Sequence, residues 1–306
     1  MFGNAGYNYP EFKKSQFTKL FEKQFGSAPE PGDRAPDFEL RTVDGDKIRL
    51  SDFRDESNVL LVFGSATCPL TASSIGGLQK LYEDYNDDGV EVLFVYVREA
   101  HPGDQIPSHS TMADKVRAAE LLRDEEDLEF PILVDDLSGK VHRKYSGQAN
   151  PAFLIDKSGR IAYRQLALDP GEMQEAIDEL LERQEERGAD HAIVHGGEST
   201  DIPAIKPMLF AHRALERGGQ RAISNFREEM GVPGRMAVVG SRVARPVAEH
   251  PGTSLATAAA IAGVIGLGLW AGKQLRERRF GERPYQYPSY RKYSEVGDYG
   301  DEAVGI

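Results

Sequence analysis

The hydrophobic pattern between residues 58 and 187 alternates short apolar runs with longer amphipathic stretches. Runs that are apolar at nearly every position are typical of strands buried on both faces, whereas apolar residues three or four positions apart indicate helices. Buried strands are expected at 58–64, 90–97, 130–135 and twice within 150–166, where a turn at 157–159 joins them. Helices are expected over 66–85, 112–127 and 169–187.

Local signals refine these helices. Asp169 fits the N-cap of the helix at 169–187, Pro170 its first position and Glu172 the acid of a capping box. The pair Gly76 and Gly77 weakens the prediction at 66–85, because glycine is a poor helix former. In the helix at 112–127, the residues expected to face inward are Met112, Val116, Ala119 and Leu122.

The order of these elements predicts an α/β domain over 33–189. A βαβ unit followed by a hairpin and a terminal helix is the skeleton of a thioredoxin-like fold, with a central mixed sheet flanked by helices. The alternation alone also permits other α/β folds. Residues 1–32 are interpreted as an N-terminal helical extension outside this domain, with Phe17, Leu20 and Phe21 on one face of a helix over 11–25.

A mostly helical C-terminal extension is predicted beyond the α/β domain. Residues 190–252 are interpreted as a linker, starting with a loop at 187–200 and containing a basic amphipathic helix over 207–230 that Gly218 and Gly219 interrupt. The segment 253–272 holds twenty residues without a charge, enough for one transmembrane helix. The alternative is a buried helix rich in alanine and glycine. Residues 273–306 are expected to form a basic and then disordered tail.

Charge separates the chain into unlike parts. The net charge of the chain is −12, but residues 1–199 carry −16 and residues 200–283 carry +6. The acidic part argues against a nucleic-acid surface. The segment 253–272 predicts a membrane-associated protein with a single C-terminal span. Because no signal peptide is visible, we expect its domain to face the cytoplasm. If 253–272 does not span, a soluble cytoplasmic protein is expected.

The chain contains one cysteine, Cys68, in the stretch GSATCPL. A single cysteine excludes an internal disulfide, a CxxC redox pair and an all-cysteine metal site, and no metal site is predicted. At a turn from strand to helix, the N–H groups and positive partial charge of the helix N-terminus would favour the nucleophilic thiolate. Ser65 and Thr67 could add hydroxyl groups. The alternative is an inert cysteine in the core.

Three stretches in order resemble the iodothyronine deiodinases, a branch of the redoxin and peroxiredoxin superfamily. They are FGSATCP (63–69), VYVREAHPGD (95–104) and IPSHSTMADKVRAAELL (106–122). The segments PGDRAPDFEL and ANPAFLIDKSGRI are similar to redoxins more generally. The resemblance covers about 33–185 and implies a thioredoxin fold with an oxidoreductase site.

The resemblance also implies roles for individual residues. Cys68 takes the place of the deiodinase selenocysteine, and Ser65 and Thr67 match the flanking hydroxyl residues. The implied catalytic partners and supporting residues are Glu99, His101, Tyr96 and His109, with Pro151 preceded by a cis bond. Without the resemblance, both histidines would be interpreted as solvated loop residues.

The predicted function is a thiol-dependent oxidoreductase that uses Cys68 for reductive dehalogenation or peroxide reduction. Ala66 stands where deiodinases carry a second cysteine, so an external thiol must regenerate Cys68, and no bound cofactor is expected. The expected partners are a small-molecule substrate and this thiol, without nucleic acid, and the sequence is compatible with a homodimer. The alternative is a membrane-tethered redoxin-fold module that binds a partner without catalysis.

Overall fold

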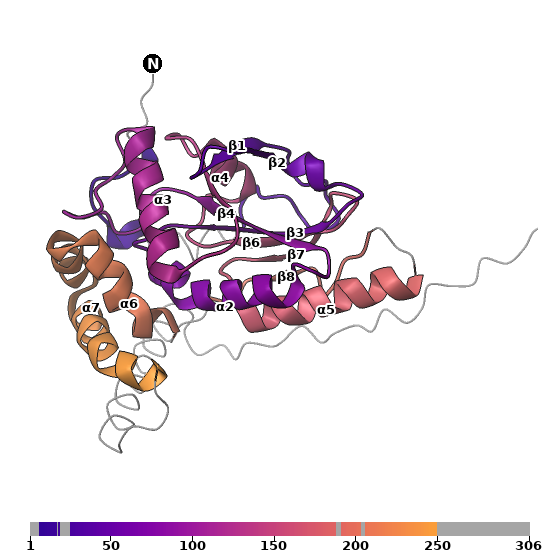
Figure 1. Ribbon diagram of the computed structural model, residues 1–306. Coiled ribbons are helices and arrows are strands. Elements are labelled where there is room, and N and C mark those ends of the chain that lie inside the picture. Colours follow the sequence, from indigo (N-terminus) through magenta and orange to yellow (C-terminus); the bar gives the residue numbers. More distant parts are fainter. Residues whose placement is uncertain (1–5, 17, 19–24, 188–190, 203–205, 250–306) are drawn as a thin grey trace, which may run out of the picture. The chain divides into compact units, whose positions relative to one another are not determined.

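The computed structural model describes residues 6–16, 18, 25–187, 191–202 and 206–249 (Figure 1). The strands are β1 (Glu39–Thr42), β2 (Lys47–Arg49), β3 (Asn58–Gly64), β4 (Val90–Tyr96), β5 (Ile132–Val134), β6 (Ala152–Ile155), β7 (Ile161–Gln165) and β8 (Glu198–Ser199). The helices are the 3₁₀ turn η2 (Leu50–Phe53), α2 (Pro69–Tyr85), α3 (Met112–Glu126), α4 (Lys140–Tyr145), α5 (Pro170–Arg187), α6 (Lys206–Gly218) and α7 (Gln220–Glu249).

Within these ranges the strands form one mixed sheet in the order β2-β1-β5-β4-β3-β6-β7-β8. The three inner strands β5, β4 and β3 are parallel, and β6 and β7 continue the sheet as an antiparallel hairpin beside β3. This is the predicted thioredoxin-like arrangement of a βαβ unit followed by a hairpin and a helix. It brings the carboxyl ends of β3 and β4 side by side, where Gly64 pairs with Tyr96.

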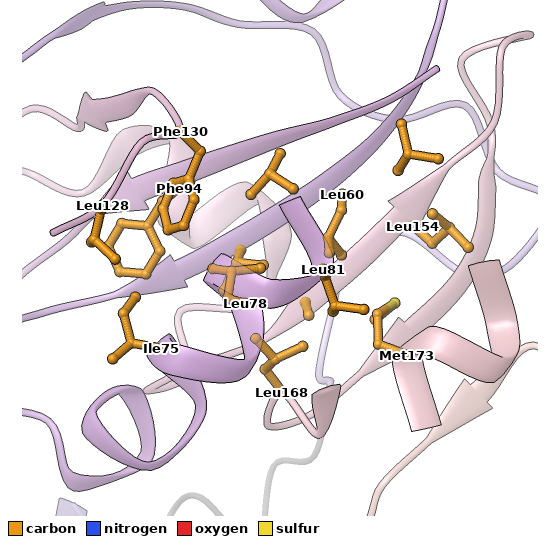
Figure 2. Close-up of a cluster of buried hydrophobic side chains, with 14 of the residues drawn as sticks. Leu60, Ile75, Leu78, Leu81, Phe94, Leu128, Phe130, Leu154, Leu168 and Met173 are labelled. Carbon is orange, nitrogen blue, oxygen red and sulfur yellow. The ribbon is translucent and has the colours of Figure 1, made fainter. Parts of the chain in front are cut away.

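The central strands are apolar throughout because both faces of the sheet are covered. In β3, Leu60 and Val62 join a core with α2, α3 and α5, whereas Leu61 and Phe63 join a second core with α4 and residues 25–38. Figure 2 shows Leu78 and Leu81 of α2 packed over Leu60, Phe94 and Leu154 of the sheet.

The predicted helices α2 and α5 are confirmed. Asp169 Oδ1 accepts hydrogen bonds from the N–H groups of Gly171 and Glu172, which caps α5 as expected. Gly77 does not break α2, since its missing side chain lets α5 approach: a Cβ there would lie 2.5 Å from Cγ of Pro170. In α3 the prediction for Met112 is wrong, because 40% of this residue is exposed at the start of the helix.

The segments flanking the domain are more ordered than predicted. Residues 187–200 are not only a linker, because β8 lies within them and pairs in parallel with β7. Residues 6–12 do not stand outside the domain: Tyr7 and Phe12 are buried, and the Tyr7 hydroxyl hydrogen-bonds to His142 Nδ1 at 2.8 Å. The basic segment 207–230 does form helices, and α6 ends at Gly218 as predicted.

Several predictions fall outside the described residues. Of the helix expected over 11–25, residues 14–16 and 18 are helical, whereas 11–13 and 25 are not. The remaining residues, including Phe17, Leu20 and Phe21, lie outside the described part. The predicted span at 253–272 and the tail at 273–306 also lie outside. Within the described part of the chain, no helix has both the length and the apolar character needed to cross a membrane.

Candidate active site

Cys68 lies where the sequence places it, between the end of β3 and the start of α2. Its backbone is extended and forms the N-cap of α2, and Pro69 begins the helix, where its missing N–H costs nothing. The loop 65–67 turns the chain between the two elements. Cys68 is only 2% exposed, so the thiol is closed off from solvent in this structure.

The Glu99 carboxylate, just beyond β4, binds this loop from the inside. Its Oε2 accepts hydrogen bonds from the N–H of Thr67 at 3.1 Å and from Thr67 Oγ1 at 2.6 Å. Its Oε1 accepts the Tyr96 hydroxyl and lies 3.0 Å from His109 Nε2. The Tyr96 hydroxyl in turn accepts the N–H of Ala66. The three stretches that resemble deiodinases therefore converge on one buried carboxylate.

Glu99 and the residues that hydrogen-bond to it, Thr67, Tyr96 and His109, form what we call the Glu99 network. These hydrogen bonds determine the protonation state of the Glu99 carboxyl group. Burial raises the pKa of Glu99, but the hydrogen bonds from His109, Thr67 and Tyr96 outweigh it and leave the pKa below its ordinary value. Burial, and then the nearby Glu99 charge, hold the pKa of Tyr96 well above its usual range. Glu99 is thus an ionised acceptor, and Tyr96 is a neutral donor.

The Cys68 thiol has a different electrostatic balance. Burial raises its pKa, and hydrogen bonds from Thr71 and Leu70 in the first turn of α2 lower it by less. The first turn of α2 thus favours the thiolate as expected, but desolvation is the larger effect in this closed arrangement and leaves the pKa of Cys68 raised. The surrounding cluster is apolar. It consists of Leu70, Ala100, Ala149, Ala167 and Ile202.

His101 is buried rather than solvated. Its ring packs between Phe12, at 4.4 Å, and Phe226 of α7, at 5.2 Å between ring centroids. Burial lowers the pKa of His101 to about 3, so the imidazole is neutral at physiological pH. Its Nδ1 has no hydrogen-bond partner among the described residues. His101 reaches the cysteine loop through its backbone N–H, which donates to Thr67 Oγ1 at 3.0 Å.

Ser65 supports the loop from its other side. Its Oγ accepts the N–H of Ala100 at 3.3 Å, so both flanking hydroxyl residues, Ser65 and Thr67, hold the 99–101 segment against the cysteine loop. His109 is also buried, which excludes the interpretation as a solvated loop residue.

The segment before β6 closes the site beside β3. Pro151 is buried, and its carbonyl accepts the Phe63 N–H at 3.0 Å. The expected cis bond is wrong, because no peptide bond among the described residues is cis. Asn150, the residue before Pro151, was not among the predicted site residues. It holds this segment against β3 and α2, because its Nδ2 donates to the Phe63 carbonyl at 2.9 Å and its Oδ1 accepts from Ser74 Oγ.

Arg217, near the end of α6, also contacts the cysteine loop, although its sequence context does not predict it. Arg217 is 3% exposed in its side chain, and its Nη1 donates to the Ala66 carbonyl at 3.3 Å. Its Nε pairs with Glu125 at 2.6 Å, and Nη2 pairs with Glu126. Nothing local in the sequence indicates this role, because the contact joins residues 151 positions apart.

Comparison with known proteins agrees with this geometry. Residues 31–164 match the AhpC/TSA family. The chain is 31% identical over 137 residues to thyroxine 5-deiodinase from Gallus gallus, covering 41% of this chain and 52% of that protein. It is 29% identical over 153 residues to type II iodothyronine deiodinase from Bos taurus, covering 45% and 56%. The chain is thus similar to the AhpC/TSA family over residues 31–164 and to the deiodinases over a similar length.

The chain spans about half the length of the curated relatives it matches. Among solved structures it is similar to a putative thiol:disulfide interchange protein DsbE from Chlorobium tepidum, at 24% identity and a TM-score of 0.41, covering 50% of this chain and 99% of that one. Peroxidoxin BcpB from Mycobacterium tuberculosis is 18% identical with a TM-score of 0.37, covering 52% and 98%.

Proposed function

We propose that the protein is a thiol-dependent oxidoreductase in which Cys68 reductively removes a halogen from a small organic molecule. The observation that carries the proposal is the Glu99 network, since it joins the cysteine loop to Tyr96 and His109, the residues that match the deiodinase motifs. The curated relatives that the chain matches include proteins named deiodinases.

The reaction needs one nucleophile, one proton and two equivalents of an external thiol. The Cys68 thiolate forms a bond to the halogen, the carbon–halogen bond breaks with its electron pair on carbon, and carbon takes up a proton. A first external thiol displaces halide from the sulfenyl halide and forms a mixed disulfide with Cys68. A second thiol releases Cys68 and leaves as the oxidised disulfide. The external thiol supplies both electrons.

The neighbouring residues suit distinct parts of this chemistry. The Glu99 carboxylate, held by Thr67 and Tyr96, fixes the loop that carries Cys68, and His109 is fixed by Glu99. His101 is neutral, and its unpartnered Nδ1 can hydrogen-bond to a polar group of a bound substrate. Proton delivery to carbon would come from His109, since the neutral His101 holds no acidic proton.

Peroxide reduction is a second candidate, favoured by the match of residues 31–164 to the AhpC/TSA family. Cys68 would attack the peroxide oxygen, giving a sulfenic acid and releasing an alcohol or water. One external thiol would convert the sulfenic acid into a mixed disulfide and water, and a second would restore the thiol. The same cysteine and the same reductant serve both reactions.

The experiment supplies the full-length chain with dithiothreitol and either 2-iodophenol or hydrogen peroxide. We expect iodide release that disappears in Cys68→Ser and falls at least about tenfold in Glu99→Gln or His109→Gln. His195→Gln is the matched control, because His195 lies beside Tyr163 and α5 and makes no described contact with the cysteine loop.

The outcomes separate the alternatives. Peroxide consumption without iodide release would replace dehalogenation by the second candidate. No turnover of either substrate would contradict both and leave the non-catalytic binding module, which the buried, protonated Cys68 would then suit. Equal iodide release by the wild type and Cys68→Ser would exclude the proposed nucleophile.

A further inference from the structure

Residues 7–14, which we call the strap, pack against the loops around the cysteine site. The Tyr9 hydroxyl donates to the carbonyl of Ala100, which packs against Cys68. Phe12 packs on the ring of His101. With the strap in this position, both Cys68 and His101 are buried.

One end of the strap is fixed to the interior of the domain. Tyr7 is buried, and its hydroxyl hydrogen-bonds to His142 Nδ1 at 2.8 Å. Its ring lies over Gly139, where a side chain would collide with it, since a Cβ would fall 2.0 Å from the Tyr7 ring. Asn8 adds a hydrogen bond of 2.8 Å to the Leu137 carbonyl.

The other end of the strap is fixed to the surface of α7. Glu229 accepts hydrogen bonds from Lys13 Nζ at 3.1 Å and from the backbone N–H of Lys14 at 2.9 Å. Arg221 donates to the Pro10 carbonyl at 3.2 Å, and Phe226 packs against Phe12. The Lys13 side chain is 56% exposed, so the ion pair with Glu229 is open to solvent and salt.

The helix α7 is itself docked onto the site. The Gly218 carbonyl accepts the N–H of Gln105 at 3.0 Å, and Asp104 Oδ1 accepts the N–H of Arg221 at 2.7 Å. The backbones meet so closely that a Cβ at Gly103 would lie 2.0 Å from the Gly218 carbonyl oxygen. The α6–α7 junction is therefore a fixed base, and the strap is the part of the cover that surface contacts hold.

We infer that the strap is a gate which closes the Cys68 site and opens by releasing its contacts with α7 at Glu229 while its Tyr7 end stays anchored. This inference rests on the proposed function for its purpose, since a gate matters only if Cys68 meets a substrate. The strap would also keep water and oxidants from the thiol between turnovers.

The single cysteine makes the gate measurable without any substrate. Ellman's reagent, added to the full-length chain under native conditions, reports only Cys68. We expect slow labelling of the wild type, labelling about three- to fivefold faster in Glu229→Gln, and at least about tenfold faster in Phe12→Ala. Glu228→Gln is the matched control, because it removes an adjacent exposed charge with no described hydrogen bond to the strap.

Circular dichroism checks that each variant is folded. If Phe12→Ala does not fold, Glu229→Gln still tests the gate. Equal labelling rates in the wild type, Glu228→Gln and Glu229→Gln would overturn the gate. Wild-type labelling as fast as in guanidinium would overturn it as well. If labelling follows the expectation but no substrate turns over, the gate stands and the proposed function fails, so the two results are distinguishable.

Discussion

The cysteine loop and the strap meet at the same site but are held by different kinds of contact. The loop is fixed from inside by the ionised, fully buried Glu99, whereas the strap is fixed to α7 by an ion pair at the surface. Removing a partner from a buried charge network is costly, and exposed ion pairs contribute little. The cysteine loop is therefore held by costlier contacts than the strap that lies against it.

The largest expected loss of stability comes from a change at Glu99, which holds the cysteine loop from inside the domain. Glu99→Ala leaves Thr67, Tyr96 and His109 without their shared acceptor, so we expect a loss of about 3–5 kcal/mol in the free energy of unfolding, measured by urea denaturation. Glu91→Ala, at the other end of β4, should cost about 0.5 kcal/mol. Equal stability of the two variants would contradict the central role of Glu99.

Arg217 tests whether α6 belongs to the rigid region. Arg217→Ala leaves Glu126 and the Ala66 carbonyl without a buried donor, and we expect a loss of about 2–3 kcal/mol. Arg213→Ala removes a more exposed pair with Glu126 and should cost less than about 1 kcal/mol. Thermal unfolding of both variants makes the comparison. A larger loss of stability in Arg213→Ala than in Arg217→Ala would mean that Arg213, and not Arg217, holds α6 in place.

Acid should destabilise the closed state through two buried histidines. Burial lowers the pKa of His101 and His142 to about 3, whereas in the unfolded chain both titrate near 6.5. The unfolded state therefore binds more protons between these values, and stability falls as pH decreases from about 6.5 to 3, by up to about 1.4 kcal/mol per histidine per pH unit. A melting temperature that stays level from pH 7 to 4 would refute this.

The smallest effect concerns the pH profile of the thiol. Because burial raises the pKa of Cys68, the rate of its alkylation by iodoacetamide should keep rising above pH 9 in the native protein. In guanidinium the rate should level off near the ordinary thiol pKa of about 8.5. A native profile that levels off below pH 8 would mean that Cys68 is held as a thiolate.

The elements with strong local signals were predictable. The Asp169 cap, the apolar run at 58–64 and the position of Cys68 between strand and helix all depend on neighbours in the chain. The strand β8 escaped prediction because Glu198 and Ser199 carry no apolar alternation and form a strand only by pairing with β7. Met112 was misplaced because helical spacing fixes its face but not whether another element covers it.

The sequence by itself determined the α/β domain and the position of Cys68 between strand and helix, because periodicity records local structure. The resemblance to deiodinase motifs singled out Glu99 and His109. Only the tertiary structure decided the state of these groups. The protonation of Cys68 and His101 depends on how fully each is desolvated, and that burial involves Phe12, Phe226 and Ile202, residues distant in sequence. Contacts between residues so far apart produce no recognisable pattern in the sequence. The reactivity of Cys68 and its access to solvent therefore depend on tertiary packing.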